Sequence, residues 1–466
     1  MPLSSIKAGY LNSSLLKRRL LSGSTWAFGG KVGGAAIGVI TNGLLARMLS
    51  PSEFGAYFLA LSIISFGALV GALGLTKTTI RFVAESMGLD RPGRARRMIL
   101  TVLCLGLLGS MSVSLAYWLV VGDLLGEYLF HSSFLVAVTG LMAGWMAISV
   151  MQEITAETFR GFHDIRMATL LGGLATGGSS GGIVMRVLLV VCLVLLWSGG
   201  AETDLQTVML VCVGAGSVSL LLGGLFLRGK LASLGPQGAE TSVGPKEVMR
   251  DAVPILGISL TTFVLLSADI WILGALGSSA EVAVYGATSR LVILIAMPLL
   301  VTNLVVPPIV AEMYAQGRTV ELERTLRTFS TLAGAPSLLV LLAFIFLGGP
   351  MLGLVYTDYY QSGATVLILL SAAKMVAVWS GSCGTVLQYT GHQASMLRVS
   401  VLTSVFFIIG ALLVVRDYGP VGVASVAAAT TVLQNVSLVL VAKRKTGMWT
   451  HLSFSLSPLR KVLANR

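Results

Sequence analysis

Twelve long apolar stretches, separated by polar loops, constrain the fold of this chain more than any other feature. A segment of about 20 apolar residues crosses a bilayer as a helix, because only a helix closes its backbone hydrogen bonds within one segment. Only 11% of the 466 residues are charged, whereas a soluble domain carries about 25%. We therefore expect an all-α integral membrane protein. The expected spans are 24–47, 55–76, 98–121, 134–156, 172–198, 205–227, 252–275, 282–306, 332–355, 363–388, 396–415 and 420–442.

The lysines and arginines predict the orientation of these spans. Of the 32 basic residues, 26 fall in the termini and loops of one side and two, Arg47 and Arg416, on the other. Basic residues accumulate on the cytoplasmic side of a membrane. We therefore expect a multi-pass protein of a bacterial or archaeal cytoplasmic (inner) membrane, with both termini in the cytoplasm.

An internal repeat divides the spans into two halves. The stretch LLARMLSPSEFGAY (44–57) matches ILGALGSSAEVAVY (272–285) at an offset of 228, and VAE at 83–85 recurs at 310–312. With six spans each, the halves have the same orientation, so we expect two pseudo-symmetric six-helix lobes around a central cavity. The expected segments are a cytoplasmic amphipathic start (1–22), an N-lobe (23–232), a cytoplasmic linker (233–250), a C-lobe (251–442) and a basic cytoplasmic tail (443–466).

The end of the first span resembles a known family. The turn L-A-R-x-L-x-x-x-x-[FY]-G-x-[YF] is typical of polysaccharide-type flippases, a branch of the multidrug/oligosaccharidyl-lipid/polysaccharide exporter superfamily. The matching residues here are Leu45, Ala46, Arg47, Leu49, Phe54, Gly55 and Tyr57. The resemblance implies two six-helix lobes that move lipid-linked sugars by alternating access, without covalent chemistry. It also implies membrane lipid and a lipid-linked oligosaccharide as binding partners, and a polysaccharide polymerase and chain-length proteins as candidate partners.

Five ionisable residues stand out within the expected spans. An ionisable side chain inside a membrane costs at least roughly 2.5–3.5 kcal/mol, so it normally faces a cavity or a partner. Lys31, Arg186, Arg290 and Lys374 are candidate substrate-binding cations, and Asp269 is a candidate for ion pairing or ion coupling. Helical spacing places polar residues on the faces of these charges. The candidate polar residues of the cavity are Asn42, Ser259, Thr262 and Gln388.

Structural roles compete with binding for several of these charges. Lys31 lies about two turns, or roughly 10 Å, from the inner end of its span, where a lysine reaches the surface by snorkelling. Arg186 follows a glycine-rich stretch and could serve to hold irregular backbone. Asp269 and Arg290 have similar depths, which favours an ion pair between them. Lys374 is nearest the middle of the bilayer, has no evident acidic partner and is the best candidate for function.

The excess of positive charge in the spans favours an anionic substrate. Lysine and arginine bind phosphate oxygens, and a polyprenyl-linked sugar carries phosphate or pyrophosphate. We therefore expect a flippase that moves an O-antigen, capsule or exopolysaccharide unit to the outer leaflet. The alternatives are a cation-coupled multidrug exporter, a lipid II flippase and, with less support, a membrane polysaccharide polymerase.

Enzymatic and metal-binding functions have little support in the sequence. The outer loops are short, D-x-D does not occur, and the four histidines are isolated from one another. The four cysteines lie in apolar runs, where cysteine normally serves packing. The net charge of +12 is too dispersed for binding to nucleic acid. We expect neither a cofactor nor a metal.

Overall fold

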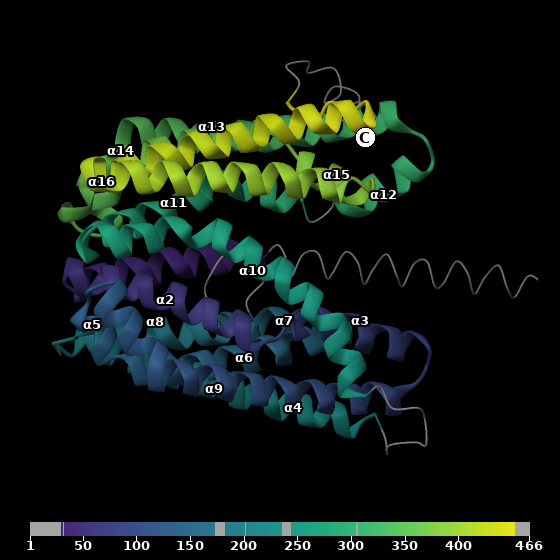
Figure 1. Ribbon diagram of the computed structural model, residues 1–466, viewed down its shortest axis with the longest axis horizontal. Coiled ribbons are helices and arrows are strands. Elements are labelled where there is room, and N and C mark those ends of the chain that lie inside the picture. Colours follow the sequence, from purple (N-terminus) through teal and green to yellow (C-terminus); the bar gives the residue numbers. More distant parts are fainter. Residues whose placement is uncertain are drawn as a thin grey trace, which may run out of the picture. The chain divides into compact units, whose positions relative to one another are not determined.

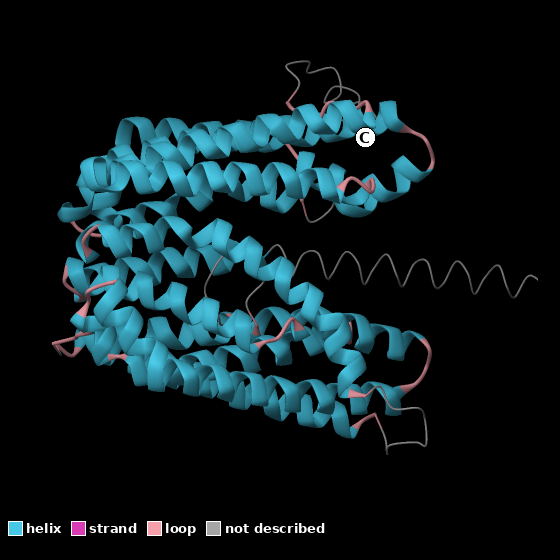
Figure 2. Ribbon diagram, viewed as in Figure 1, coloured by secondary structure: helices cyan, strands magenta, loops and turns pink. Residues whose placement is uncertain are grey.

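The computed structural model describes residues 29–30, 32–172, 182–200, 202–234, 244–303 and 306–452. Over these ranges the regular structure is helical and contains no strand (Figures 1 and 2). An apolar helix, Val32–Met48, comes first. The labelled α-helices are α2 (Pro51–Gly71), α3 (Leu75–Gly88), α4 (Pro92–Ala116), α5 (Ser133–Ala137), α6 (Thr139–Gly161), α7 (Ile165–Leu171), α8 (Ile183–Ser198), α9 (Leu205–Ala232), α10 (Pro245–Leu276), α11 (Ser279–Thr302), α12 (Val306–Ala315), α13 (Thr319–Val355), α14 (Ala364–Ser380), α15 (Cys383–Tyr389) and α16 (Gln393–Thr446). Shorter π- and 3₁₀-helical pieces are η1 (Tyr117–Val121), η2 (Leu124–Leu129) and η3 (Asp358–Gly363).

Each of the twelve expected spans corresponds to a helix in the described part of the chain. Seven helices there are long and apolar enough to cross a membrane, and three shorter apolar helices accompany them. The longest of the seven, α16, contains two expected spans. The remaining span is α6, whose apolar character is reduced by Gln152 and Glu153. The expectation of an all-α membrane protein is confirmed.

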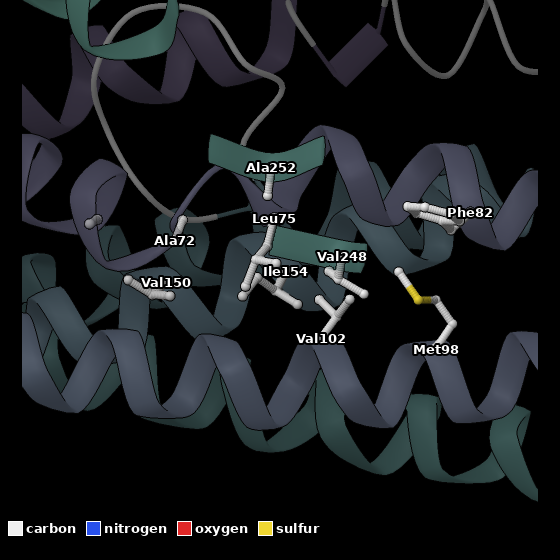
Figure 3. Packing of buried hydrophobic residues seen from close by; sticks show 10 residues of the cluster. Ala72, Leu75, Phe82, Met98, Val102, Val150, Ile154, Val248 and Ala252 are labelled. Atoms are coloured by element: carbon white, nitrogen blue, oxygen red, sulfur yellow. The ribbon is translucent and has the colours of Figure 1, made fainter. Parts of the chain in front are cut away.

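The chain packs as two units, and α10 contributes to both. The first unit ends at Ser267 and the second begins at Ala268. In the first unit α6 packs against α2, α3, α4 and α9. A buried cluster joins α3, α4 and α6 through Leu75, Val102 and Ile154, and the start of α10 adds Val248 and Ala252 to it (Figure 3). The first turns of α10 therefore belong to the N-terminal packing.

The turn between α2 and α3 explains how closely α10 approaches. Gly74 has a left-handed backbone (φ +77°), which favours glycine. A Cβ at this position would lie 2.1 Å from the carbonyl oxygen of Ala252 on α10. Nearby, Arg81 of α3 forms an ion pair with Asp251 of α10. Backbone contact, apolar burial and an ion pair thus all hold α10 to α3.

In the second unit α14 packs against α11, α13 and α16. The long α16 is two antiparallel helices joined at Gly419, whose backbone (φ 50°, ψ −137°) is not helical. Side-chain contacts pair residues across this turn. The Gln434 amide donates to Ser400 Oγ at 3.3 Å, and a Cβ at Gly410 would meet Val426. The two halves of α16, which Figure 1 draws side by side in light green and yellow, are the eleventh and twelfth spans.

The sequence repeat is also a structural repeat. Ser50 and Glu53 form a capping box at the start of α2, in which each side chain bonds the backbone of the other. Ser278 and Glu281 form the same capping box at the start of α11. Both glutamates also contact the start of the last span of their half. The Glu53 carboxylate accepts a hydrogen bond from the backbone amide of Leu205 at 3.3 Å. The Glu281 carboxylate lies close to Gly419, where an added Cβ would be 2.7 Å from Glu281 Oε1.

Two expected boundaries differ from the structure. The tenth span was expected as one helix over 363–388, but α14 ends at Ser380 and α15 begins at Cys383. The ninth span was expected to begin at residue 332, but its helix, α13, begins at Thr319. The glycine-rich approach to the fifth span falls mostly on residues 173–181, outside the described residues.

Candidate functional site

Two of the predicted site residues, Lys31 and Asn42, belong to the expected first span. Lys31 lies outside the described residues, so its role stays a prediction. Asn42 is buried, and its amide nitrogen donates to the carbonyl of Gly38 at 2.7 Å, one turn back in the same helix. Because that bond uses one of the two N–H groups of the amide, the second N–H and the amide oxygen remain for a substrate.

Arg186 of α8 contacts the turn of the first helix that follows Lys31. Its Nη1 donates to the carbonyl oxygen of Gly34 at 2.8 Å. A Cβ at Gly34 would lie 3.0 Å from the same nitrogen, so the glycine leaves room for the guanidinium. In the sequence, Gly34 is three residues after Lys31. The structure thus places one predicted cation, Arg186, against the backbone of the first helix.

Three helices of the second unit bring Asp269, Tyr285 and Lys374 together. Asp269 is half-buried near the end of α10, and its Oδ1 accepts from the backbone of Ile270 at 2.9 Å. Tyr285 of α11 is buried, and its hydroxyl is a hydrogen-bonding neighbour of the Asp269 carboxylate. The ammonium of Lys374 on α14 is a neighbouring charge of the same carboxylate. Lys374 therefore has an acidic neighbour on another helix, which the sequence did not reveal.

Arg290 lies on α11, half-buried, near the hydroxyl of Tyr356. That hydroxyl donates to the carbonyl of Ala287 at 2.9 Å, which fixes the tyrosine against α11. The pairing of Asp269 with Arg290 stays a prediction. What the structure adds is a second candidate partner for Asp269, the ammonium of Lys374.

The remaining predicted polar residues are spread over different elements. Ser259 is half-buried on the part of α10 that packs with the first unit. The side chain of Thr262 lies outside the described residues. Gln388 is exposed on α15 and its backbone carbonyl accepts from Gln393 at 3.1 Å. The helix is interrupted at Gly381, between Lys374 and Gln388. The helical spacing that was used to place Gln388 on the face of Lys374 therefore does not apply.

Sequence reasoning missed a charged group in α6. Glu157 is buried and pairs with Arg160, whose Nη1 lies 2.6 Å from Glu157 Oε2. Glu153, one turn earlier, is half-buried and interacts electrostatically with Arg160. The signal was present, because Glu153 falls inside the expected span 134–156 and should have been counted with the intramembrane charges.

The basic residues of this set can bind an anion. Lysine and arginine offer fixed positive charge and hydrogen-bond donors to an anion. Within the ranges that the structure describes, no group of three or more His, Cys, Asp or Glu could hold a metal ion. The four cysteines are free thiols, two of them buried.

Comparison with known proteins relates this chain to polysaccharide export and to transporter folds. Residues 20–314 match the family described as Polysaccharide biosynthesis protein. Over 62 residues, which make up 13% of each protein, this chain is 40% identical to the succinoglycan biosynthesis transport protein ExoT of Rhizobium meliloti (strain 1021). That match thus covers far less than two thirds of ExoT.

Solved structures of transporters share the fold. An inward-facing multidrug resistance MATE family transporter of the MOP superfamily aligns with a TM-score of 0.72 and 15% identity, over 90% of this chain and 94% of that one. A MOP superfamily transporter from Pyrococcus furiosus, whose binding pocket is described as having reverse polarity, aligns with a TM-score of 0.66 and 15% identity, over 92% and 96%. At such identities the likeness concerns the fold.

Proposed function

Because this chain belongs to the polysaccharide biosynthesis protein family and has the fold of a membrane transporter, we propose that it flips a polyprenyl-linked oligosaccharide across the cytoplasmic membrane. The substrate would be an O-antigen, capsule or exopolysaccharide unit joined to its lipid through phosphate or pyrophosphate. The observation that carries the proposal is Lys374, a lysine that stays exposed on α14 within a membrane span.

The charges inside the spans support an anionic substrate. Four basic residues, Lys31, Arg186, Arg290 and Lys374, stand against two acidic ones, Asp269 and Glu153. An exporter of cationic drugs would need the opposite excess, since carboxylates attract its substrate. A phosphate group meets the lysine as a point charge and the arginines as planar forks with paired donors.

Lys374 and Asp269 suggest how the site behaves without substrate. The carboxylate of Asp269 partly neutralises the lysine, which reduces the cost of an unpaired ammonium inside the membrane. A phosphate that enters the site would compete with this carboxylate for the ammonium. Whether the carboxylate then takes up a proton or a sodium ion decides how transport is coupled.

The lipid tail and the membrane potential complete the proposed cycle. The polyprenyl chain would stay in the bilayer while the sugar crosses through the protein. With both termini in the cytoplasm, outward movement of one negative charge gains roughly 2.3 kcal/mol per 100 mV of inside-negative potential. A polymerase and chain-length proteins would receive the flipped unit on the outer side.

A reconstituted flipping assay tests the proposal. Purified protein in vesicles should move a fluorescent polyprenyl-pyrophosphate oligosaccharide between leaflets, and should not move the matched polyprenyl glycoside that lacks phosphate. Equal movement of both lipids would show that the phosphate takes no part in substrate recognition. Competition by excess unlabelled lipid II, without competition by the oligosaccharide lipid, would assign the protein to peptidoglycan precursors instead.

A further inference from the structure

The segment Gly447–Leu452, which follows α16, is packed into the second unit. We call it the C-terminal strap. Gly447 ends α16 with a left-handed backbone (φ +75°), and its carbonyl accepts from the ammonium of Lys443 at 2.6 Å. The same ammonium lies 5.2 Å from the centroid of the Trp449 ring. Lys443 therefore fixes the direction in which the strap leaves the helix.

Two buried side chains anchor the strap. Met448 is 2% exposed and belongs to an apolar cluster that includes Val310 of α12, Leu326 of α13 and Val386 of α15. Thr450 is fully buried. A peptide that hung loosely from the last span would bury neither residue. The strap is thus part of the packing between α12, α13 and α15.

The strap caps the end of α14. The last carbonyls of a helix have no partner within the helix, and unpaired carbonyls are costly away from water. The hydroxyl of Thr450 donates to the carbonyl of Ser380 at 2.9 Å. The backbone amide of Leu452 donates to the carbonyl of Trp379 at 2.9 Å. The strap thus supplies two hydrogen bonds that α14 would otherwise obtain only by continuing as a helix.

The break after α14 is shaped around the strap. Gly381 has a left-handed backbone (φ +70°), and a Cβ there would lie 2.1 Å from Ser330 Oγ and 2.4 Å from the carbonyl oxygen of Thr450. The Ser330 hydroxyl itself donates to that carbonyl at 2.9 Å. On the far side of the break, Ser382 Oγ donates to Asn303 Oδ1 at 2.6 Å. Residues from α13, the strap and the end of α11 therefore meet at one point.

We propose that the strap positions Lys374: by capping α14 at Trp379 and Ser380, it keeps the helix broken at Gly381 and fixes the rotation of the turn that carries the lysine. Lys374 lies seven residues before Gly381, which is about two helical turns or roughly 10 Å. Without the strap, the free carbonyls of α14 would pair with residues 383 and 384, and α14 would join α15. This proposal depends on the proposed function in one respect, because that function gives Lys374 a substrate to bind.

Two truncations form the matched test. A chain that ends at Thr446 lacks the strap, whereas a chain that ends at Leu452 keeps it and lacks only residues 453–466. Each is made with Lys374→Cys after the four native cysteines have been replaced, and the rate of modification by a water-soluble maleimide is measured in detergent. Position 374 is exposed, so we expect the rate to fall severalfold when loss of the strap turns the helix, and to stay unchanged in the longer chain.

Point variants cover the case in which the shorter chain fails to fold. Thr450→Val keeps the shape of the side chain but lacks the hydroxyl, and it should slow modification at position 374. Thr450→Ser restores the donor and should restore the rate. Equal rates in Thr450→Val, Thr450→Ser and the unchanged strap would overturn the proposal.

Flipping measured with Lys374 intact separates the two proposals. We expect Thr450→Val to lose flipping and Thr450→Ser to regain it. Loss of flipping in Thr450→Val with an unchanged modification rate would contradict positioning by the strap. A changed rate with normal flipping would support the strap as a positioning element and contradict the role of Lys374 in transport.

Discussion

At the scale of single residues, the intramembrane charges are held by contacts that lie far apart in the sequence. Arg186 bonds the backbone of Gly34, and Asp269 has Tyr285 and Lys374 as neighbours. The sequence predicted which residues are charged within the spans, because a charge in an apolar run is visible by itself. It could not predict their partners, since helical spacing relates residues within one helix only. For that reason Lys374 was expected without an acid.

Two adjacent glycines test the contact of Arg186. Gly34→Ala should displace the guanidinium, because the new Cβ would lie 3.0 Å from Nη1. Relative to Gly33→Ala, which has the same gain in helix propensity, we expect it to lower the free energy of unfolding by about 1 kcal/mol, the value of one hydrogen bond. Gly33→Ala is the control, since a Cβ there meets nothing within 4 Å. Thermal unfolding in detergent measures both, and equal midpoints would contradict the contact.

A double-mutant comparison identifies the partner of Asp269. Removal of one member of a desolvated ion pair can cost 3–5 kcal/mol, whereas removal of both can be nearly neutral. Asp269→Ala should therefore lower the yield of folded protein, and adding either Lys374→Ala or Arg290→Ala should recover it if that base is the partner. From the neighbouring charges we expect Lys374→Ala to give the larger recovery. A larger recovery with Arg290→Ala would instead support the ion pair between Asp269 and Arg290 that their similar depths predict.

At the scale of helices, the spans were predictable and their breaks were not. Apolar length shows where a helix crosses the membrane, and the repeat around Ser50 and Ser278 shows where two of them start. The break at Gly381 depends on Ser330 and Thr450, which are 51 and 69 residues away in the sequence. A glycine within an apolar run gives no sign of such contacts. The strap, expected as part of a cytoplasmic tail, was missed for the same reason.

The turn within α16 provides a test at this scale. Gly419→Ala would place a Cβ 2.7 Å from Glu281 Oε1 and strain a left-handed backbone. Gly391→Ala has the backbone strain alone, because nothing lies within 4 Å of its Cβ. The strain should cost roughly 1–2 kcal/mol in both. We expect Gly419→Ala to unfold at the lower temperature, and the reverse order would contradict the contact between Glu281 and the turn.

At the scale of the whole molecule, the pattern of basic residues predicts one orientation for all twelve spans. Reporter fusions after Asp123, Glu202 and Asp358 should lie outside, and fusions after Arg94 and Lys246 should lie inside. The break within the tenth span does not alter this expectation, because α14 and α15 together still lead from one side to the other. A single inverted position in either half would contradict the assignment of spans in that half.

The central claim is that a positive charge at position 374 recognises the phosphate of a lipid-linked sugar. Its most direct test is the initial rate of flipping of a polyprenyl-pyrophosphate oligosaccharide by Lys374→Ala, Lys374→Arg and the control Arg324→Ala, which removes an exposed charge outside the expected spans. Loss of one charge-assisted hydrogen bond corresponds to roughly 1.5–3 kcal/mol, or about 10- to 150-fold in rate. We expect such a loss in Lys374→Ala, partial activity in Lys374→Arg and normal activity in the control. Normal flipping by a folded Lys374→Ala protein would contradict it.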